Sequence, residues 1–114
     1  MKTVNTFSVI IYTGAKEHYN GTIHSYDEAK EILQKYCNIN PLCVTLKQIE
    51  YIYKDRNEIG FEIGLINYPR FPSIPEEITN KAIEIAIIFR EKFNQFKVSI
   101  ETPEKTFMIE EEIQ

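Results

Sequence analysis

Two Ser-x-x-Glu tetrapeptides, at 25–28 and 73–76, constrain the fold of this sequence more than any other feature. In such a capping box the serine side chain accepts a hydrogen bond from the backbone amide three residues later, and the glutamate side chain reaches back to the serine amide. Each tetrapeptide therefore marks the start of a helix. Apolar residues at helical spacing follow both, and they predict one helix that ends within 38–41 and a second over 74–94.

Five further segments have the apolar, β-branched and aromatic patterns of strands, at 4–12, 43–53, 59–67, 97–102 and 106–110. Short turns at 54–57 and 103–105 make the strands that flank them antiparallel neighbours. The order β-α-β-β-α-β-β then predicts an α+β fold in which two helices pack on a mostly antiparallel sheet. The ferredoxin-like split βαβ arrangement is the nearest named topology.

The glycines predict local structure at two places. Gly60 and Gly64 occupy one face of the third strand, where they leave room for a helix, a ligand or another backbone, or mark bulges. Close packing is the commoner cause of such a pair. The polar segment 13–24 contains the turn-forming pair Asn20-Gly21, which predicts a small ribbon.

The length of 114 residues suits a single domain, 1–114, whose core needs no disulfide or structural metal. Cys37, Cys43, His18 and His24 lack the spacing of a zinc site, so we expect no metal or cofactor and two reduced, mostly buried cysteines. No apolar run approaches the roughly 20 residues of a membrane helix, and we find no export signal, so a cytoplasmic protein is expected. The excess of Ile and Lys is typical of AT-rich bacteria and their phages.

Charge and hydropathy also bear on partners. The net charge of −4 argues against nucleic acid or an anionic membrane as the main partner, and Tyr51, Tyr53 and Phe61 are interpreted as core residues rather than base-stacking ones.

The 74–94 helix is apolar around most of its girth, so it packs between the sheet and the first helix or lies at a subunit interface. We favour the second interpretation and expect a homo-oligomer. The acidic run at 110–112 is expected to be solvated and without a specific role.

The segment 67–73 carries the strongest sign of a binding site, because it places polar, aromatic and cationic side chains between two prolines at a helix start. The free amides of that helix start and the two-pronged guanidinium of Arg70 are suited to an anion. The segment 13–24 ranks second, because it gathers imidazoles and phenols. The candidate ligand-binding residues are Asn67, Tyr68, Arg70, Phe71, Ser73, Tyr12, His18, Tyr19 and His24. A purely structural alternative remains for 67–73, in which the prolines stiffen a crossover, Phe71 plugs the core and Arg70 is solvated.

Catalysis finds little support in the sequence. Cys37 falls at the C-terminal end of a helix, where the dipole disfavours a thiolate. The sequence places no group of carboxylates at strand ends, where enzymes that handle metal-bound phosphates need them. The sequence therefore predicts a small non-catalytic binding protein that takes an anionic small molecule, such as a nucleotide, at 67–73, with the 13–24 segment beside it. Two alternatives stay open. One is a module that binds a protein partner without a small ligand, and the other is a small enzyme that uses His18 and His24.

Overall fold

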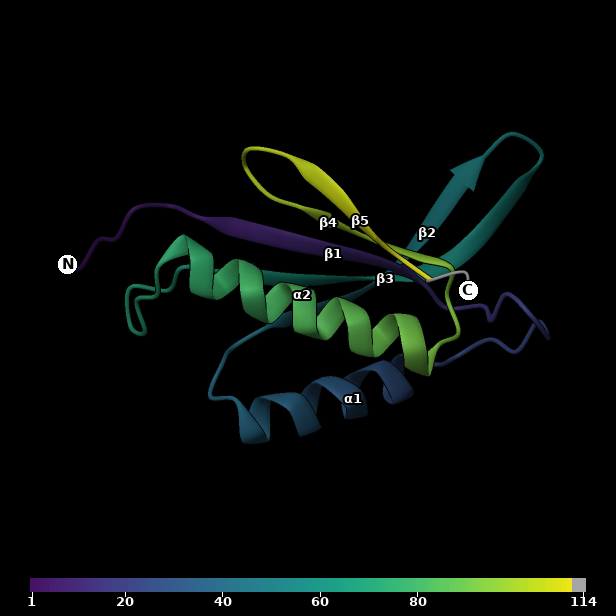
Figure 1. Cartoon of the computed structure of the whole chain (residues 1–114), viewed down its shortest axis with the longest axis horizontal. Helices are drawn as coiled ribbons and strands as arrows, with labels where there is room; N and C mark the ends of the chain where they lie inside the picture. Colours follow the sequence, from purple (N-terminus) through teal and green to yellow (C-terminus); the bar gives the residue numbers. More distant parts are fainter. Residues whose placement is uncertain (112–114) are drawn as a thin grey trace.

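The computed structural model describes residues 1–111, and these fold into seven elements in the predicted order (Figure 1). The elements are β1 (Ser8–Gly14), α1 (Tyr26–Ile39), β2 (Thr45–Tyr53), β3 (Arg56–Ile66), α2 (Pro75–Lys92), β4 (Lys97–Glu101) and β5 (Thr106–Glu110). The predicted fold class, two helices packed on a mostly antiparallel sheet, is confirmed. No helix within residues 1–111 is long and apolar enough to cross a membrane.

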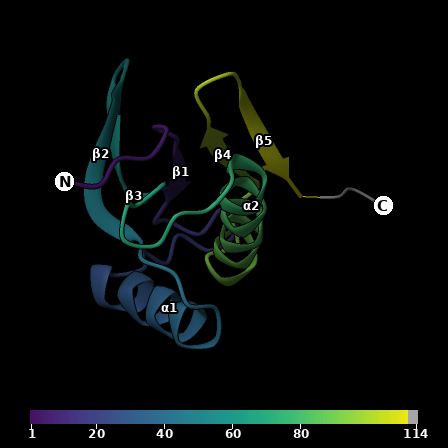
Figure 2. The same cartoon turned by 90° about the vertical axis from the view of Figure 1, so that its left-hand side faces the viewer.

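The five strands form one sheet in the order β2-β3-β1-β4-β5, and every neighbouring pair is antiparallel. Each helix links two strands that have a third strand between them, which is the split βαβ arrangement, and β5 adds a fifth strand at the edge. Both helices lie on the same side of the sheet (Figure 2). No helix within residues 1–111 lies on the opposite face, which we call the open sheet face.

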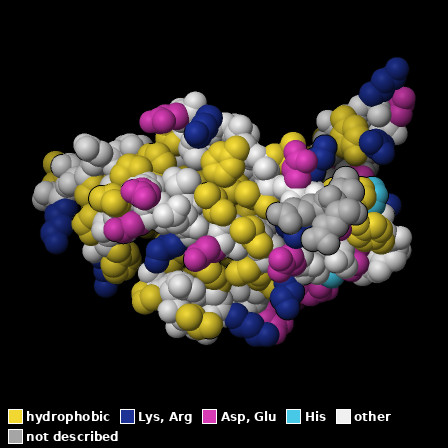
Figure 3. Space-filling view, viewed as in Figure 1, with side chains coloured by type: hydrophobic (Ala, Val, Ile, Leu, Met, Phe, Trp, Pro, Cys, Tyr) yellow, Lys and Arg dark blue, Asp and Glu magenta, His cyan; other side chains and the backbone are white. Residues whose placement is uncertain are grey.

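The core lies between the sheet and the helices. Val9 and Ile11 of β1 are fully buried, as are Ile85 and Phe89 of α2 at 1% exposure or less. The apolar girth of α2 is shared between the sheet and the side toward α1, where Ile88 is half-buried, so much of it is covered within one chain. Ile87 remains 38% exposed, and hydrophobic side chains gather over the middle of α2 (Figure 3).

The two predicted capping boxes have different outcomes. The box at Ser25 forms as expected, because the Ser25 side chain accepts from the Glu28 amide and Glu28 reaches back. The prediction of a capping box at Ser73 is wrong. The Ser73 amide donates instead to Oδ1 of Asn67 at 2.9 Å, and the helix begins one residue later, with Ile74 as an N-cap that lacks a side-chain hydrogen bond.

The largest differences between the predicted and observed strand boundaries fall at the starts of two strands. β1 begins at Ser8 rather than at residue 4, and β3 begins at Arg56, because the β2–β3 turn contains only Lys54 and Asp55, with Asp55 at φ 63°. The longer hairpin projects past the core and leaves Ile52 79% exposed.

Two further predictions concern the 13–24 segment and the cysteines. The bridge between residues 16 and 23 confirms a small ribbon in the 13–24 segment. Both cysteines are free, but Cys43 is exposed and Cys37 half-buried, so the prediction of buried thiols is wrong for Cys43.

Candidate functional site

The crossover 67–73 is a tightly tied loop. The Asn67 side chain accepts from the Ser73 amide at 2.9 Å and donates to the backbone oxygen of Asn5 at 3.0 Å, and the Phe71 amide donates to the Tyr68 oxygen at 2.9 Å. Arg70 turns over the Phe71 ring, with its guanidinium carbon 5.4 Å from the ring centroid. Phe71 is 57% exposed and therefore does not plug the core.

The second predicted segment is anchored by His24. Its Nε2 lies 2.8 Å from Glu17 and its Nδ1 2.5 Å from Glu28, while its ring stacks on Phe93 at a centroid distance of 4.3 Å. Asn94 also donates to Glu17 at 2.5 Å. Both ring nitrogens are engaged, so His24 joins the loop to the start of α1 and the end of α2.

His18 and Tyr19 lie on the outside of the same loop. The His18 ring packs on Phe96 at a centroid distance of 3.5 Å, and the Tyr19 hydroxyl donates to the Glu111 carboxylate at 2.7 Å. The predicted acidic tail thus has a partner at Glu111, while Glu112 lies outside the described residues.

The two predicted segments lie at opposite ends of the molecule (Figure 1). Ser8, at the start of β1, pairs with Ile66 beside the crossover, whereas Gly14, at its end, pairs with Gly60 beside the loop. Seven residues of strand separate them, which is roughly 20 Å at about 3.3 Å per residue. The structure therefore does not bring the two segments together.

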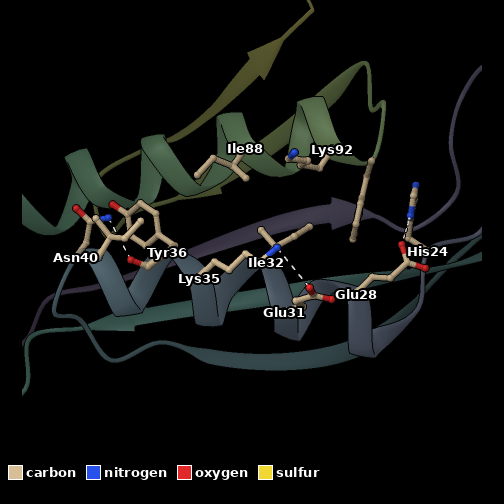
Figure 4. Close-up of a pocket in the computed structure, with 11 residues that line it drawn as sticks. His24, Glu28, Glu31, Ile32, Lys35, Tyr36, Asn40, Ile88 and Lys92 are labelled. Carbon is tan, nitrogen blue, oxygen red and sulfur yellow. Dashed lines mark hydrogen bonds and ion pairs between the residues drawn. The ribbon is translucent and has the colours of Figure 1, made fainter.

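A cleft of about 460 Å³ separates α1 from α2 (Figure 4). His24 and Glu28 lie at one end and Tyr36 and Asn40 at the other, with Lys92 of α2 facing the α1 side chains (Figure 4). Lys35 pairs with Glu31 at 3.4 Å along α1. The Tyr36 hydroxyl donates to Glu84 of α2, and burial and then this carboxylate raise the pKa of Tyr36. The α1 side chains that would carry acid–base chemistry here, and His24 beside them, are thus already engaged with neighbouring side chains.

The acidic contacts of His24 make folding stability depend on pH. The pKa of Glu17 is lowered mainly by the hydrogen bond from Asn94, and that of Glu28 mainly by the hydrogen bond from His24, relative to their ordinary value of 4.5. A lowered pKa in the folded state gives stability that is present above the unfolded value and lost as pH falls through the folded value. We therefore expect the free energy of unfolding to decrease below about pH 4.5, and to decrease less in Glu17→Gln. Urea unfolding between pH 3 and 6 measures this, with Glu104→Gln in an exposed turn as control; equal slopes in all three proteins would refute it.

The open sheet face carries a second group of functional side chains, from four different strands. Tyr12 of β1 pairs across the sheet with Glu62 of β3, and the Tyr12 hydroxyl donates to Glu101 of β4 at 3.2 Å. The Tyr51 ring of β2 lies over Gly60, and its hydroxyl donates to the Thr13 backbone oxygen at 3.3 Å. These four residues, Tyr12, Tyr51, Glu62 and Glu101, are called the tyrosine–glutamate cluster.

The cluster is electronegative. Burial raises the pKa of Tyr51 to about 12, with Glu62 as the next cause, and burial followed by Glu101 raises the pKa of Tyr12. Both phenols therefore stay protonated and donate hydrogen bonds near neutral pH. Within residues 1–111, neither Glu62 nor Glu101 forms an ion pair with lysine or arginine. A shallow depression of about 170 Å³ adjoins Glu62. Lys47 of β2 lies opposite Glu62 and offsets part of this charge, but two carboxylates beside aromatic rings still favour a cation over the predicted anion.

Sequence reasoning identified Tyr12 but missed the other three members. Tyr51 was interpreted as a core residue. The sequence also did not indicate which side chains pack against Gly60 and Gly64. The structure shows that Gly60 accommodates the Tyr51 ring and Gly64 the Thr45 hydroxyl, so close packing is their role. The available signal was the alternation in β3, where Glu62 stands between two glycines on a face that no helix covers.

Comparisons with known proteins agree with the fold. No protein-family model and no curated protein sequence matches the chain. A phage SAM lyase in complex with S-methyl-5′-thioadenosine is 20% identical, over 97% of this chain and 94% of that one, with a TM-score of 0.69. A phage SAM lyase in the apo state is 22% identical, over 95% of this chain and 91% of that one, with a TM-score of 0.68.

These likenesses establish a shared fold, and both neighbours are enzymes. They contradict the prediction of a non-catalytic binding protein. Of the alternatives that the sequence left open, they favour the small enzyme.

Proposed function

We propose that this chain is an enzyme that cleaves a sulfonium nucleoside of the SAM type, and that it does so at the open sheet face. The observation that carries the proposal is the likeness, over 97% of the chain, to a SAM lyase that holds S-methyl-5′-thioadenosine. The tyrosine–glutamate cluster provides a matching chemical environment, because its carboxylates and rings suit a positively charged sulfur.

The chemistry of such a reaction makes modest demands on the protein. When the bond between the sulfonium sulfur and the amino-acid side chain breaks, its electron pair stays on sulfur, and the neutral thioether S-methyl-5′-thioadenosine leaves. A lyase adds no water, so the four-carbon fragment either loses a proton from the neighbouring carbon or closes a ring onto its own carboxylate. The main task of the protein is therefore to hold the substrate in a reactive conformation.

The residues of the cluster can divide that task. Glu62 and Glu101 would face the positive charges of the sulfonium and the α-ammonium group, and the Tyr12 hydroxyl would hold Glu101 in place. The Tyr51 ring, supported by Gly60, offers an aromatic face. The loop histidines are less suitable, because both His24 nitrogens are engaged and His18 packs on Phe96.

A turnover assay tests the proposal. Purified protein is incubated with SAM, and S-methyl-5′-thioadenosine is quantified by liquid chromatography and mass spectrometry against a buffer control, which accounts for spontaneous decay. We expect catalytic, protein-dependent formation of this thioether in more than stoichiometric amount. Release at the buffer rate would refute the proposed activity.

We also propose that the chain self-associates, as its sequence predicts. The exposed Ile87 and the hydrophobic side chains over the middle of α2 support this (Figure 3). Light scattering should give a multiple of the chain mass of 13.4 kDa. A particle of 13.4 kDa at micromolar concentration would contradict self-association.

A further inference from the structure

We infer that the cavity beneath the crossover is a binding site for a neutral, largely apolar small molecule. This crossover cavity measures about 440 Å³. Its walls come from segment 41–43, the end of β3, the crossover itself and Ile78 of α2. The volume falls within the range of small-molecule sites, about 300–1,000 Å³.

The cavity is separate from the tyrosine–glutamate cluster. It is lined by Leu65, which is 1% exposed and belongs to the core cluster on the helix side of the sheet. Glu62 lies an odd number of positions away along β3, so its side chain points to the other face. Ile66, which also lines the cavity, lies on the open face, but it is four residues from Glu62, roughly 13 Å at about 3.3 Å per residue. A ligand in the crossover cavity would therefore lie beyond contact distance of the Glu62 carboxylate.

The walls of the cavity are held in place by hydrogen bonds. Asn67 ties the crossover to Ser73 and to the backbone at Asn5, and the Phe71 amide closes the turn onto Tyr68. A site that is already ordered loses less conformational entropy when it binds a ligand. Two prolines within the crossover restrict the backbone further.

The lining defines the chemical class of the ligand. Among residues 1–111, no charged side chain lines the cavity, and the Arg70 guanidinium lies over the Phe71 ring. The polar side chains in the lining are Tyr68, Ser73 and Cys43. The pKa of Tyr68 is raised by burial and by the Cys43 thiol beside it, so its hydroxyl is a protonated donor. These features suit an uncharged ring compound with one or two acceptor atoms rather than the anion expected from the sequence.

Cys43 provides a reporter for the test, because its thiol is exposed and lines the cavity. The experiment uses a Cys37→Ser variant, in which Cys43 is the remaining thiol, and the neutral fluorophore N-phenyl-1-naphthylamine as the probe. We expect saturable fluorescence enhancement and at least a fivefold slower alkylation of Cys43 by iodoacetamide when the probe is bound. The anionic relative 8-anilinonaphthalene-1-sulfonate should bind at least tenfold more weakly.

Two substitutions locate the site. Cys43→Trp fills the cavity and should abolish probe binding, whereas Lys35→Trp, in the cleft between α1 and α2, should leave it unchanged. If circular dichroism shows that Cys43→Trp does not fold, the alkylation of Cys43 in Cys37→Ser decides whether the probe binds in the crossover cavity. Unchanged alkylation in the presence of the probe, equal affinity for the anionic dye, or loss of binding in Lys35→Trp alone would overturn the inference.

Discussion

Replacing Glu62 by glutamine is expected to lower kcat/KM for SAM cleavage by about 100-fold. The substitution keeps the shape of the side chain but removes a charge that faces the proposed sulfonium site and that forms no salt bridge within residues 1–111. A hydrogen bond or contact to a charged group contributes about 1.5–3 kcal/mol, and about 1.4 kcal/mol corresponds to a factor of ten. The assay is S-methyl-5′-thioadenosine formation at several SAM concentrations.

The separation of kcat from KM distinguishes two roles for this carboxylate. If the sulfur keeps most of its positive charge in the transition state, a purely electrostatic contact stabilises the bound substrate and the transition state alike, so its loss raises KM and leaves kcat nearly unchanged. A carboxylate that removes a proton acts on the reaction itself, so its loss lowers kcat. Glu58→Gln is the matched control, on the same strand and face but four residues toward the hairpin tip. Wild-type kcat/KM in Glu62→Gln, or an equal loss in Glu58→Gln, would contradict the assignment.

Gly60→Ala is expected to cost about 2–3 kcal/mol of stability and to reduce activity as well. A Cβ atom at this position would lie 2.5 Å from the backbone oxygen of Thr13 and would also overlap the Tyr51 ring. The backbone of a central strand cannot move away at low cost, and overpacking of this kind destabilises by about 1–3 kcal/mol. Displacement of Tyr51 would remove one wall of the proposed site. Urea unfolding and the turnover assay measure the two effects.

Gly64→Ala is the control for this second prediction. Its Cβ would meet the hydroxyl of Thr45 at 2.5 Å, and that side chain can rotate away. We expect its stability to stay within about 1 kcal/mol of the wild type, since the strain is relieved and alanine is the better strand residue. Equal unfolding midpoints for Gly60→Ala and wild type would show that the Tyr51 ring does not depend on Gly60.

The parts of the fold that depend on neighbouring residues could be predicted from the sequence. The Ser25 capping box involves four consecutive residues, and both hairpins follow from local patterns, so all three are found in the structure. The Ser73 box failed because Asn67, six residues earlier, takes the Ser73 amide. A competing partner of this kind appears only when the crossover is seen in three dimensions.

The candidate site depended on sheet order, which local patterns do not fix. Tyr12 and Glu101 are 89 residues apart and meet because β4 pairs with β1. Tyr51 could be assigned to the open face only once its pairing with β3 was known. Conversely, the sequence marked the polar loop as a candidate for acid–base chemistry, whereas the structure shows that His24 of this loop holds three segments together.

Binding of the substrate nucleoside at the open sheet face can be tested directly by a titration with S-methyl-5′-thioadenosine that is followed by amide NMR. We expect saturable shifts centred on Tyr12, Tyr51, Glu62 and Glu101, with no comparable shifts at the crossover cavity or in the cleft between α1 and α2. Shifts confined to either of those two places, or none at all, would contradict binding at the open sheet face.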